Sequence, residues 1–181
     1  MNIYDTINNR VSIRAYKKDK IDLEIVKKVV EAACTAPSWG NKQCWRFIIV
    51  NSRVEKNLIG KAAGQPLIAQ ACMDAPYVIV VCANPKESGV KNGIEYYTFD
   101  CALAMENLVL SATEEGLSTC IVGWFDEKVV KGVLNIPENI RVVAFTPLGY
   151  ACDVPKHSTR KKPEQIIYYN TWDKNSHEEK Q

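Results

Sequence analysis

The chain has 181 residues, of which 46% are hydrophobic and 24% are charged, and its formal net charge is +2. This is the size and composition of a single globular domain, and so small a net charge gives no general signal for a nucleic-acid partner. No apolar run approaches the roughly 20 residues that a membrane span needs, and MNIYDTINNR lacks the apolar core of a signal peptide. We therefore expect a cytoplasmic protein with no nucleic-acid or membrane partner.

Helices and strands alternate along the predicted chain. In order they are a helix at residues 2–9, a helix at 22–34, a strand at 47–50, a helix at 54–63, a strand at 77–83, a helix at 94–115, a strand at 119–122, a helix at 126–134 and a strand at 141–146. Asp22 and Asp126 are candidate N-caps, while Gly64 and Gly116 mark helix ends.

This order predicts a layered α/β or α+β domain around a central sheet. The apolar run at 77–83 suits a strand that is covered on both faces. Residues 1–172 form one predicted domain, and the polar tail at 173–181 is predicted to be disordered.

The seven cysteines are scattered without a CxxC pair, and most lie in apolar segments such as YVIVVCAN and STCIVG. Reduced thiols in such segments behave as small hydrophobic side chains. His157 and His177 have no second plausible metal ligand near them in the sequence. We therefore expect no metal site.

Common catalytic signatures are missing from the sequence. It contains no GxGxxG, GxxxxGK[ST], GxSxG or HExxH pattern, which removes the usual signs of dinucleotide folds, P-loop enzymes, α/β-hydrolases and zincins. Neither histidine has the context of a catalytic base. The side chains are thus poorly equipped for nucleophilic catalysis, and a cofactor that carries the chemistry is favoured.

The first informative motif is RVSIRAY, which starts at Arg10. In an extended segment Arg10, Ser12 and Arg14 face one side, and Val11 and Ile13 face the other. Two guanidiniums beside a hydroxyl suit a phosphate group, because arginine can donate paired hydrogen bonds to its oxygens. An edge strand with a solvated polar face explains the same pattern.

The second motif is the connection APSWGNKQCW, which is rich in amides and indoles. Ser38, Asn41 and Gln43 offer hydrogen-bond donors and acceptors, and Gly40 lets the backbone approach a planar ligand closely. Alternatively, the polar groups cap the preceding helix and the tryptophans join the core. The sequence leaves both interpretations open.

The third motif is EGLSTCIVGWFD, a helix end followed by a buried strand and a glycine. Gly123 at the strand end is typical of places where main-chain N–H groups face a ligand. The helix start that follows adds a partial positive charge. A plain turn from strand to helix gives the same pattern.

Together these motifs resemble the nitroreductase family of flavoproteins, and the resemblance runs from Arg10 to about Trp172. The family pattern R-x-S-x-R-x-[FY] matches Arg10, Ser12, Arg14 and Tyr16. The pattern APSxxNxQPW matches Ala36, Pro37, Ser38, Asn41, Gln43 and Trp45. The pattern GLGTxxxGxFD matches Gly116, Leu117, Thr119, Gly123, Phe125 and Asp126. Their order and separations are specific as a set.

The resemblance implies an α+β fold with a central, mainly antiparallel sheet flanked by helices. It also implies an intertwined homodimer that binds FMN at its interface. Carried over by position, the residues implied to hold the FMN phosphate are Arg10, Ser12, Arg14, Arg160 and Lys161. Those implied to contact the flavin ring or ribityl chain are Pro37, Ser38, Asn41 and Gln43, the last two able to come from the other subunit. At the strand end, Val122 precedes the Gly123 and Trp124 main-chain N–H groups that are implied to face the flavin N5.

The implied activity is transfer of a hydride from NADH or NADPH, through FMN, to a nitroaromatic, quinone or similar acceptor by a ping-pong mechanism. No side chain receives a catalytic role, because the cofactor carries the chemistry. Two alternatives stay open. The same scaffold can perform another flavin reaction, such as dehalogenation or dehydrogenation, or it can bind flavin without turnover.

Three features depart from the family pattern. Val11 replaces a second arginine, and Cys44 replaces the proline of QPW. We interpret Cys44 as a small space-filling residue, with a redox-active thiol as the alternative. Only about ten residues, 84–93, separate the strand at 77–83 from the long helix, whereas larger members carry helices there. An open pocket with loose substrate preference is therefore expected.

Overall fold

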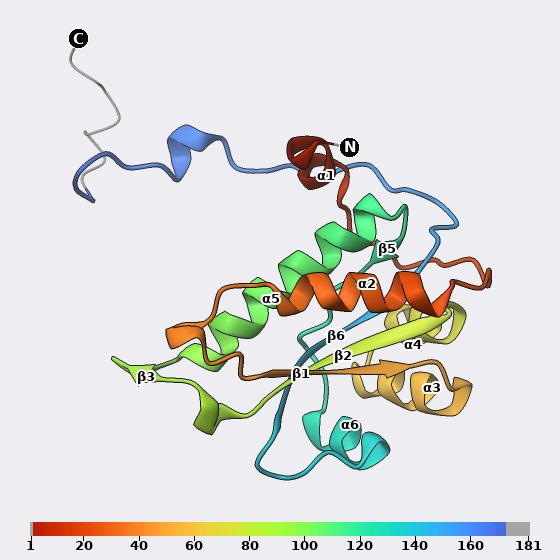
Figure 1. Ribbon diagram of the computed structural model, residues 1–181. Helices are drawn as coiled ribbons and strands as arrows, with labels where there is room; N and C mark the ends of the chain where they lie inside the picture. Colours follow the sequence, from red (N-terminus) through yellow and green to blue (C-terminus); the bar gives the residue numbers. More distant parts are fainter. Residues whose placement is uncertain (1, 173–181) are drawn as a thin grey trace.

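The computed structural model describes residues 2–172, and its centre is a four-stranded sheet in the order β1-β2-β6-β5 (Figure 1). The strands are β1 Trp45–Val50, β2 Tyr77–Ala83, β5 Ser118–Thr119 and β6 Arg141–Gly149. Every neighbouring pair is antiparallel. The prediction of an α+β fold with a mainly antiparallel sheet is confirmed.

Helices cover both faces of this sheet. They are α1 Ile3–Asn9, α2 Leu23–Cys34, α3 Arg53–Ala62, α4 Pro66–Asp74, α5 Tyr96–Glu114 and α6 Glu127–Leu134. Buried residues of α2 and α5 pack on one face, and those of α3, α4 and α6 pack on the other (Figure 1). Within β2, Ile79 and Val81 belong to the first cluster and Val78 and Val80 to the second. The predicted burial of this strand on both faces is confirmed.

The predicted helix caps are also present. The Asp22 carboxylate accepts the Glu24 N–H, and the Asp126 carboxylate accepts the N–H of Lys128. After α3, Gly64 adopts a φ of 67°, in the left-handed region that ends helices at low cost.

Several predicted boundaries are wrong. The helix predicted from residue 94 starts at Tyr96, because Ile94–Glu95 forms a strand, β4, that pairs with β3, Val90–Lys91. The strand predicted at 47–50 begins two residues earlier, and the one predicted at 119–122 is reduced to β5 and a single bridge at Val122.

The last strand, β6, continues through Pro147 to Gly149 rather than ending at Thr146. A proline in a strand interior removes one ladder donor. Here the Thr146 hydroxyl forms bonds of its own, accepting the Cys120 N–H and donating to the Pro147 carbonyl. These two bonds pair the Cys120 N–H and the Pro147 carbonyl beside the proline.

Beyond β6 the chain first stays beside the segment before α2, where the Cys152 N–H donates to the Ala15 carbonyl at 3.0 Å, and it then leaves the body of the molecule. Residues 152–172, which we call the C-terminal arm, run past α1 and away from the sheet (Figure 1). Apart from the half-buried Tyr168, every residue of the arm is exposed. The tail predicted to be disordered, 173–181, lies outside the described residues. Within residues 2–172, no helix is both long and apolar enough to cross a membrane.

Candidate active site

The first motif lies beside the β5 edge of the sheet. Ser12 forms a parallel bridge with Thr119, and the Ile13 N–H donates to the Thr119 carbonyl over 2.9 Å. Because the Ile13 side chain is buried, the alternating polar side chains point the other way. The predicted alternation holds for Ile13, whereas Val11 is only partly buried and also lines the pocket described next. The Arg10–Arg14 segment extends the sheet beyond β5.

These polar side chains line a pocket of about 230 Å³. One wall consists of Arg10, Val11, Ser12 and Arg14, and the other consists of Pro155, Lys156, His157, Ser158 and Arg160 from the start of the C-terminal arm. No carboxylate lines this pocket in the described part of the chain. A set of guanidinium, ammonium and hydroxyl donors without a carboxylate suits a phosphate group.

The structure brings together four of the five residues predicted to hold a phosphate. Arg160 lines the pocket together with the first motif, although 146 positions separate Arg160 from Arg14. Lys161, predicted at the same site, does not line the pocket and is exposed. The prediction also omits Lys156 and His157, which only the path of the arm brings to Arg10.

The second motif forms a tight loop between α2 and β1, which contains a short 3-10 turn, η1 Trp39–Asn41. Gly40, Asn41 and Gln43 have φ values of 53°, 55° and 51°. For the two side-chain-bearing residues this conformation costs on the order of 1 kcal/mol each. Ser38 Oγ accepts the Gln43 N–H at 3.0 Å, and Gln43 Nε2 donates to the Asn41 carbonyl and Oδ1 at 3.2 Å. The loop is therefore interlocked in one strained shape.

The polar side chains of this loop do not cap α2 in the described structure. That helix is closed by Thr35, whose N–H and Oγ1 both donate to the Ala32 carbonyl. Trp45 is buried in the core, whereas Trp39 is 45% exposed. The capping interpretation thus explains one tryptophan but leaves the loop amides available to a ligand.

The third motif ends in an open main-chain segment. Val122 exchanges two backbone hydrogen bonds with Phe145, at 2.8 and 3.0 Å, and the chain then leaves the sheet. Apart from the two chain neighbours of Gly123, no atom of residues 2–172 lies within 4 Å of the place where a Cβ on this glycine would sit, and Trp124 is 82% exposed. Asp126 then caps α6. The main chain at 123–124 is therefore accessible to a ligand.

The three motifs do not all lie together within a single chain. Ser12 pairs with the segment at the β5 edge, while the loop leads into β1 at the opposite edge. Four strand spacings separate them, which amounts to about 19 Å. The phosphate-binding candidates and the strand end are neighbours in one chain, whereas the loop with Asn41 and Gln43 lies across the sheet.

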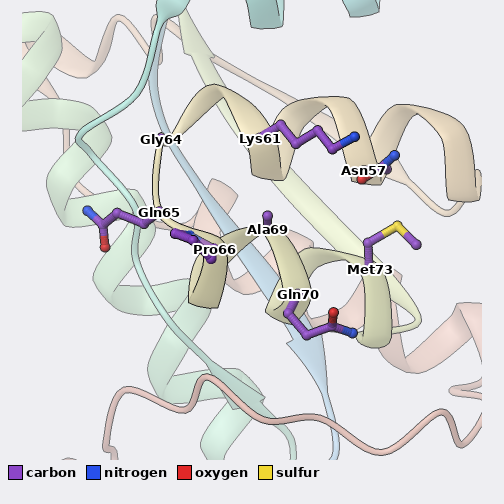
Figure 2. A pocket seen from close by; sticks show the side chains of 8 residues that line it. All are labelled: Asn57, Lys61, Gly64, Gln65, Pro66, Ala69, Gln70 and Met73. Atoms are coloured by element: carbon purple, nitrogen blue, oxygen red, sulfur yellow. The ribbon is translucent and has the colours of Figure 1, made fainter.

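Another hollow in the structure belongs to a different region. A groove of about 470 Å³ lies between α3 and α4, lined by residues that include Asn57, Lys61, Gln70 and Met73 (Figure 2). It contains none of the residues predicted for the active site. Its lining combines one ammonium with amides and apolar groups.

Cys44, the residue that departs from the family pattern, is completely buried. Burial raises the pKa of its thiol to about 11, and the neighbouring Asp100 carboxylate adds to the effect. Its Sγ lies 3.5 Å from Asp100 Oδ2, a distance that suits a weak hydrogen bond from the thiol. These features support the interpretation of Cys44 as a space-filling thiol.

Thiol labelling of the native protein should separate Cys44 from the exposed thiols. With a pKa of about 11, roughly one Cys44 side chain in ten thousand is ionised at pH 7. We expect iodoacetamide to label the exposed Cys34 and Cys152 and to leave Cys44 unmodified, as peptide mass spectrometry would show. Labelling of Cys44 at the rate of Cys152 would contradict the space-filling role.

The sequence profile described as "Nitroreductase family" matches residues 7–150 of the chain. The chain belongs to the nitroreductase family. This membership confirms the resemblance drawn from the three motifs, each of which lies within the matched residues.

Individual proteins that are similar to this nitroreductase-family chain carry related names. A protein of Archaeoglobus fulgidus, provisionally named as an NADH dehydrogenase/NAD(P)H nitroreductase, is 36% identical over 151 residues, which are 81% of this chain and 84% of that protein. The solved structure of a nitroreductase family protein from Clostridium novyi is 41% identical, covers 95% of each chain and gives a TM-score of 0.80. An iodotyrosine deiodinase of Thermotoga neapolitana is 27% identical over 197 residues, 94% of this chain and 98% of that protein.

Proposed function

We propose that this nitroreductase-family protein is an FMN-dependent oxidoreductase. In this proposal it takes a hydride from NADH or NADPH and reduces nitroaromatic, quinone or similar acceptors by a ping-pong mechanism. The observation that carries the proposal is the pocket where Arg10, Ser12, Arg14 and Arg160 meet. Three guanidiniums and a hydroxyl suit the dianionic phosphate of FMN. Bound FMN would supply the hydride chemistry that the side chains lack.

The protein's own groups would bind and orient the ring. Loop residues Ser38, Asn41 and Gln43 would donate and accept hydrogen bonds at its polar edge, in the shape that their mutual bonds impose. The main-chain N–H groups of Gly123 and Trp124 would stabilise negative charge that develops on the ring. Pro37 would lie against the ring as an apolar neighbour, while Val122, whose side chain is buried in the core, would position the main chain that follows it.

A homodimer would complete the site. The phosphate pocket and the loop lie on opposite edges of the sheet in one chain, so we propose that each flavin contacts the loop of the partner subunit. Exposed apolar side chains support such an interface. They lie on α1, on α5, beyond β5 and in the arm: Ile3, Tyr4, Ile7, Phe99, Ile121, Trp124, Val154, Ile166, Ile167, Tyr169 and Trp172. Where such side chains form a contiguous patch, they mark an interaction surface.

Anaerobic stopped-flow reduction tests the proposed activity directly. Protein loaded with FMN should lose its yellow absorbance on mixing with NADH or NADPH, and regain it on addition of a quinone or nitroaromatic. A colourless protein that gains no thermal stability from added FMN would contradict flavin binding itself. A yellow protein that neither nicotinamide bleaches would favour the alternatives.

Reductive dehalogenation is the second candidate reaction. The iodotyrosine deiodinase of Thermotoga neapolitana aligns with 94% of this chain, so the scaffold is compatible with that chemistry. Halide release from an iodinated phenol by the dithionite-reduced protein would support this reaction. A dehydrogenation or a flavin-binding role without turnover would show neither halide release nor bleaching by nicotinamides.

Three further predictions concern the chain as a whole. We propose that residues 1–172 form one FMN-binding domain, with Arg160 and Lys161 of the arm serving the phosphate site. We also propose a cytoplasmic location and a homodimer without a nucleic-acid or membrane partner. The near-neutral net charge of +2 agrees with the absence of a nucleic-acid partner.

A further inference from the structure

A buried carboxylate sits beneath the loop of residues 38–44, and the sequence motifs do not include it. Asp100, in the second turn of α5, is 1% exposed. No cationic side chain of residues 2–172 forms an ion pair with it. An ionised carboxylate in such a place is tolerated only when hydrogen-bond donors satisfy its oxygens.

Three donors converge on the two carboxylate oxygens. The Trp39 N–H donates to Oδ1 at 2.8 Å, and the Ser88 hydroxyl donates to Oδ2 at 2.9 Å. The Cys44 thiol reaches the same Oδ2 at 3.5 Å. Trp39 and Cys44 flank the strained part of the loop, so its two ends are held by one side chain of α5.

The Ser88 hydroxyl comes from a segment other than the loop. Ser88 belongs to the turn of residues 84–95, which carries a short 3-10 turn, η2 Pro85–Glu87, and the β3-β4 hairpin. Contact between the loop and this turn is close, since a Cβ added to Gly89 would lie 2.5 Å from Cε2 of Trp39. The Trp39 indole therefore rests directly on the Gly89 main chain.

We propose that Asp100 is a positioning residue for flavin binding, which fixes the loop of residues 38–44 and the turn of residues 84–95 as one rigid unit. This inference rests on the proposed flavin-binding function. Asp100 does not itself contact the ring in this proposal. Its hydrogen bonds hold the Trp39 and Cys44 ends of the loop, and so preserve the geometry in which Ser38, Asn41 and Gln43 meet the ring.

A second connection, between the turn of residues 84–95 and the start of β1 just after the loop, provides a matched control. Arg46 donates to both carboxylate oxygens of Glu87, at 3.1 and 2.9 Å, on the exposed surface. Exposed pairs of this kind contribute little, because water competes for both partners. Loss of Glu87 should therefore leave the loop in place, whereas loss of Asp100 should release it.

Riboflavin affinity reports on the loop without the phosphate pocket, because riboflavin carries the ring and ribityl chain but no phosphate. We expect Asp100→Ala to weaken riboflavin binding on the order of tenfold or more. FMN binding should weaken by the same factor, since the phosphate pocket lies at the opposite edge of the sheet. Asp100→Asn should recover most of the affinity, because its Oδ1 can still accept the Trp39 N–H and its amide can donate to Ser88.

Gly89→Ala tests the same unit with the carboxylate intact, should Asp100→Ala fail to fold. The added methyl group must displace the Trp39 indole, so we expect lower riboflavin affinity and an unchanged ratio of FMN to riboflavin affinity. Glu87→Ala should change neither affinity more than about twofold. Fluorescence titration of the full chain measures all of these values.

The possible outcomes are distinct. Wild-type riboflavin affinity in both Asp100→Ala and Gly89→Ala, or an effect of Glu87→Ala as large as theirs, would overturn the positioning role. A loss of FMN affinity without a loss of riboflavin affinity in Asp100→Ala would also overturn it. Failure of the wild-type protein to bind either flavin would instead contradict the proposed function.

Discussion

Alanine at both Arg10 and Arg14 is expected to weaken FMN binding by a factor on the order of a hundred or more. Each guanidinium lines the pocket assigned to the phosphate. A hydrogen bond to a charged group contributes about 1.5 to 3 kcal/mol, and about 1.4 kcal/mol corresponds to a tenfold change in affinity. Ser12 and Arg160 remain in the double variant, so binding should be weakened rather than abolished. Quenching of FMN fluorescence measures the affinity.

Two controls make this result specific to the phosphate. Riboflavin affinity should stay within about twofold of wild type, because the missing guanidiniums have no phosphate to bind. A Lys17→Ala/Lys20→Ala variant removes the same net charge from exposed positions outside the pocket, and it should bind FMN normally. An equal loss of riboflavin and FMN affinity, or normal FMN affinity, would show that the assignment of this pocket is wrong.

The sequence predicts most helices because their signals are local. The carboxylates of Asp22 and Asp126 occupy N-cap positions, and the apolar residues of α2 recur at helical spacing. The apolar run in β2 predicts a fully covered strand for the same reason, since burial on both faces removes any need for polar residues.

Helix α4 is absent from the prediction for a physical reason. Its nine residues are nearly all apolar or small, so no polar face produces helical periodicity. Its N-cap, Gln65, makes no capping side-chain bond. The remaining signals are Gly64, which ends α3, and Pro66 at the first position of a helix.

The candidate site is predictable only as far as its motifs are contiguous. Arg10, Ser12 and Arg14 are found because strand periodicity brings them to one side within five residues. Asp100 shows no such signal, since one carboxylate in a long helix resembles any polar position. Its partners Trp39 and Ser88 lie 61 and 12 residues away in the chain, so their convergence is a property of tertiary packing.

If the protein is a homodimer, charged substitutions of the exposed apolar side chains in the C-terminal arm should weaken it strongly. Ile166 and Ile167 are 57% and 45% exposed in the single chain, so an intramolecular core does not depend on them. If a partner subunit covers them, each contributes about 1.5 kcal/mol or more of burial free energy, and a dimer contains two arms. Ile166→Asp/Ile167→Asp should therefore raise the dimer dissociation constant on the order of ten-thousandfold, as sedimentation velocity would show.

The same variant should keep the far-UV circular dichroism of the wild type while it loses FMN, because separation of the subunits removes the partner's loop from the ring. Val54→Asp provides the matched control, since Val54 is 65% exposed on α3, on the opposite side of the body from the arm (Figure 1). It introduces the same kind of charge and should leave the dimer intact. A wild-type dimer in the arm variant would place the interface elsewhere. A monomer that still binds FMN at wild-type affinity would show that one chain completes the site. That result would contradict the proposal that the loop at each flavin comes from the partner subunit.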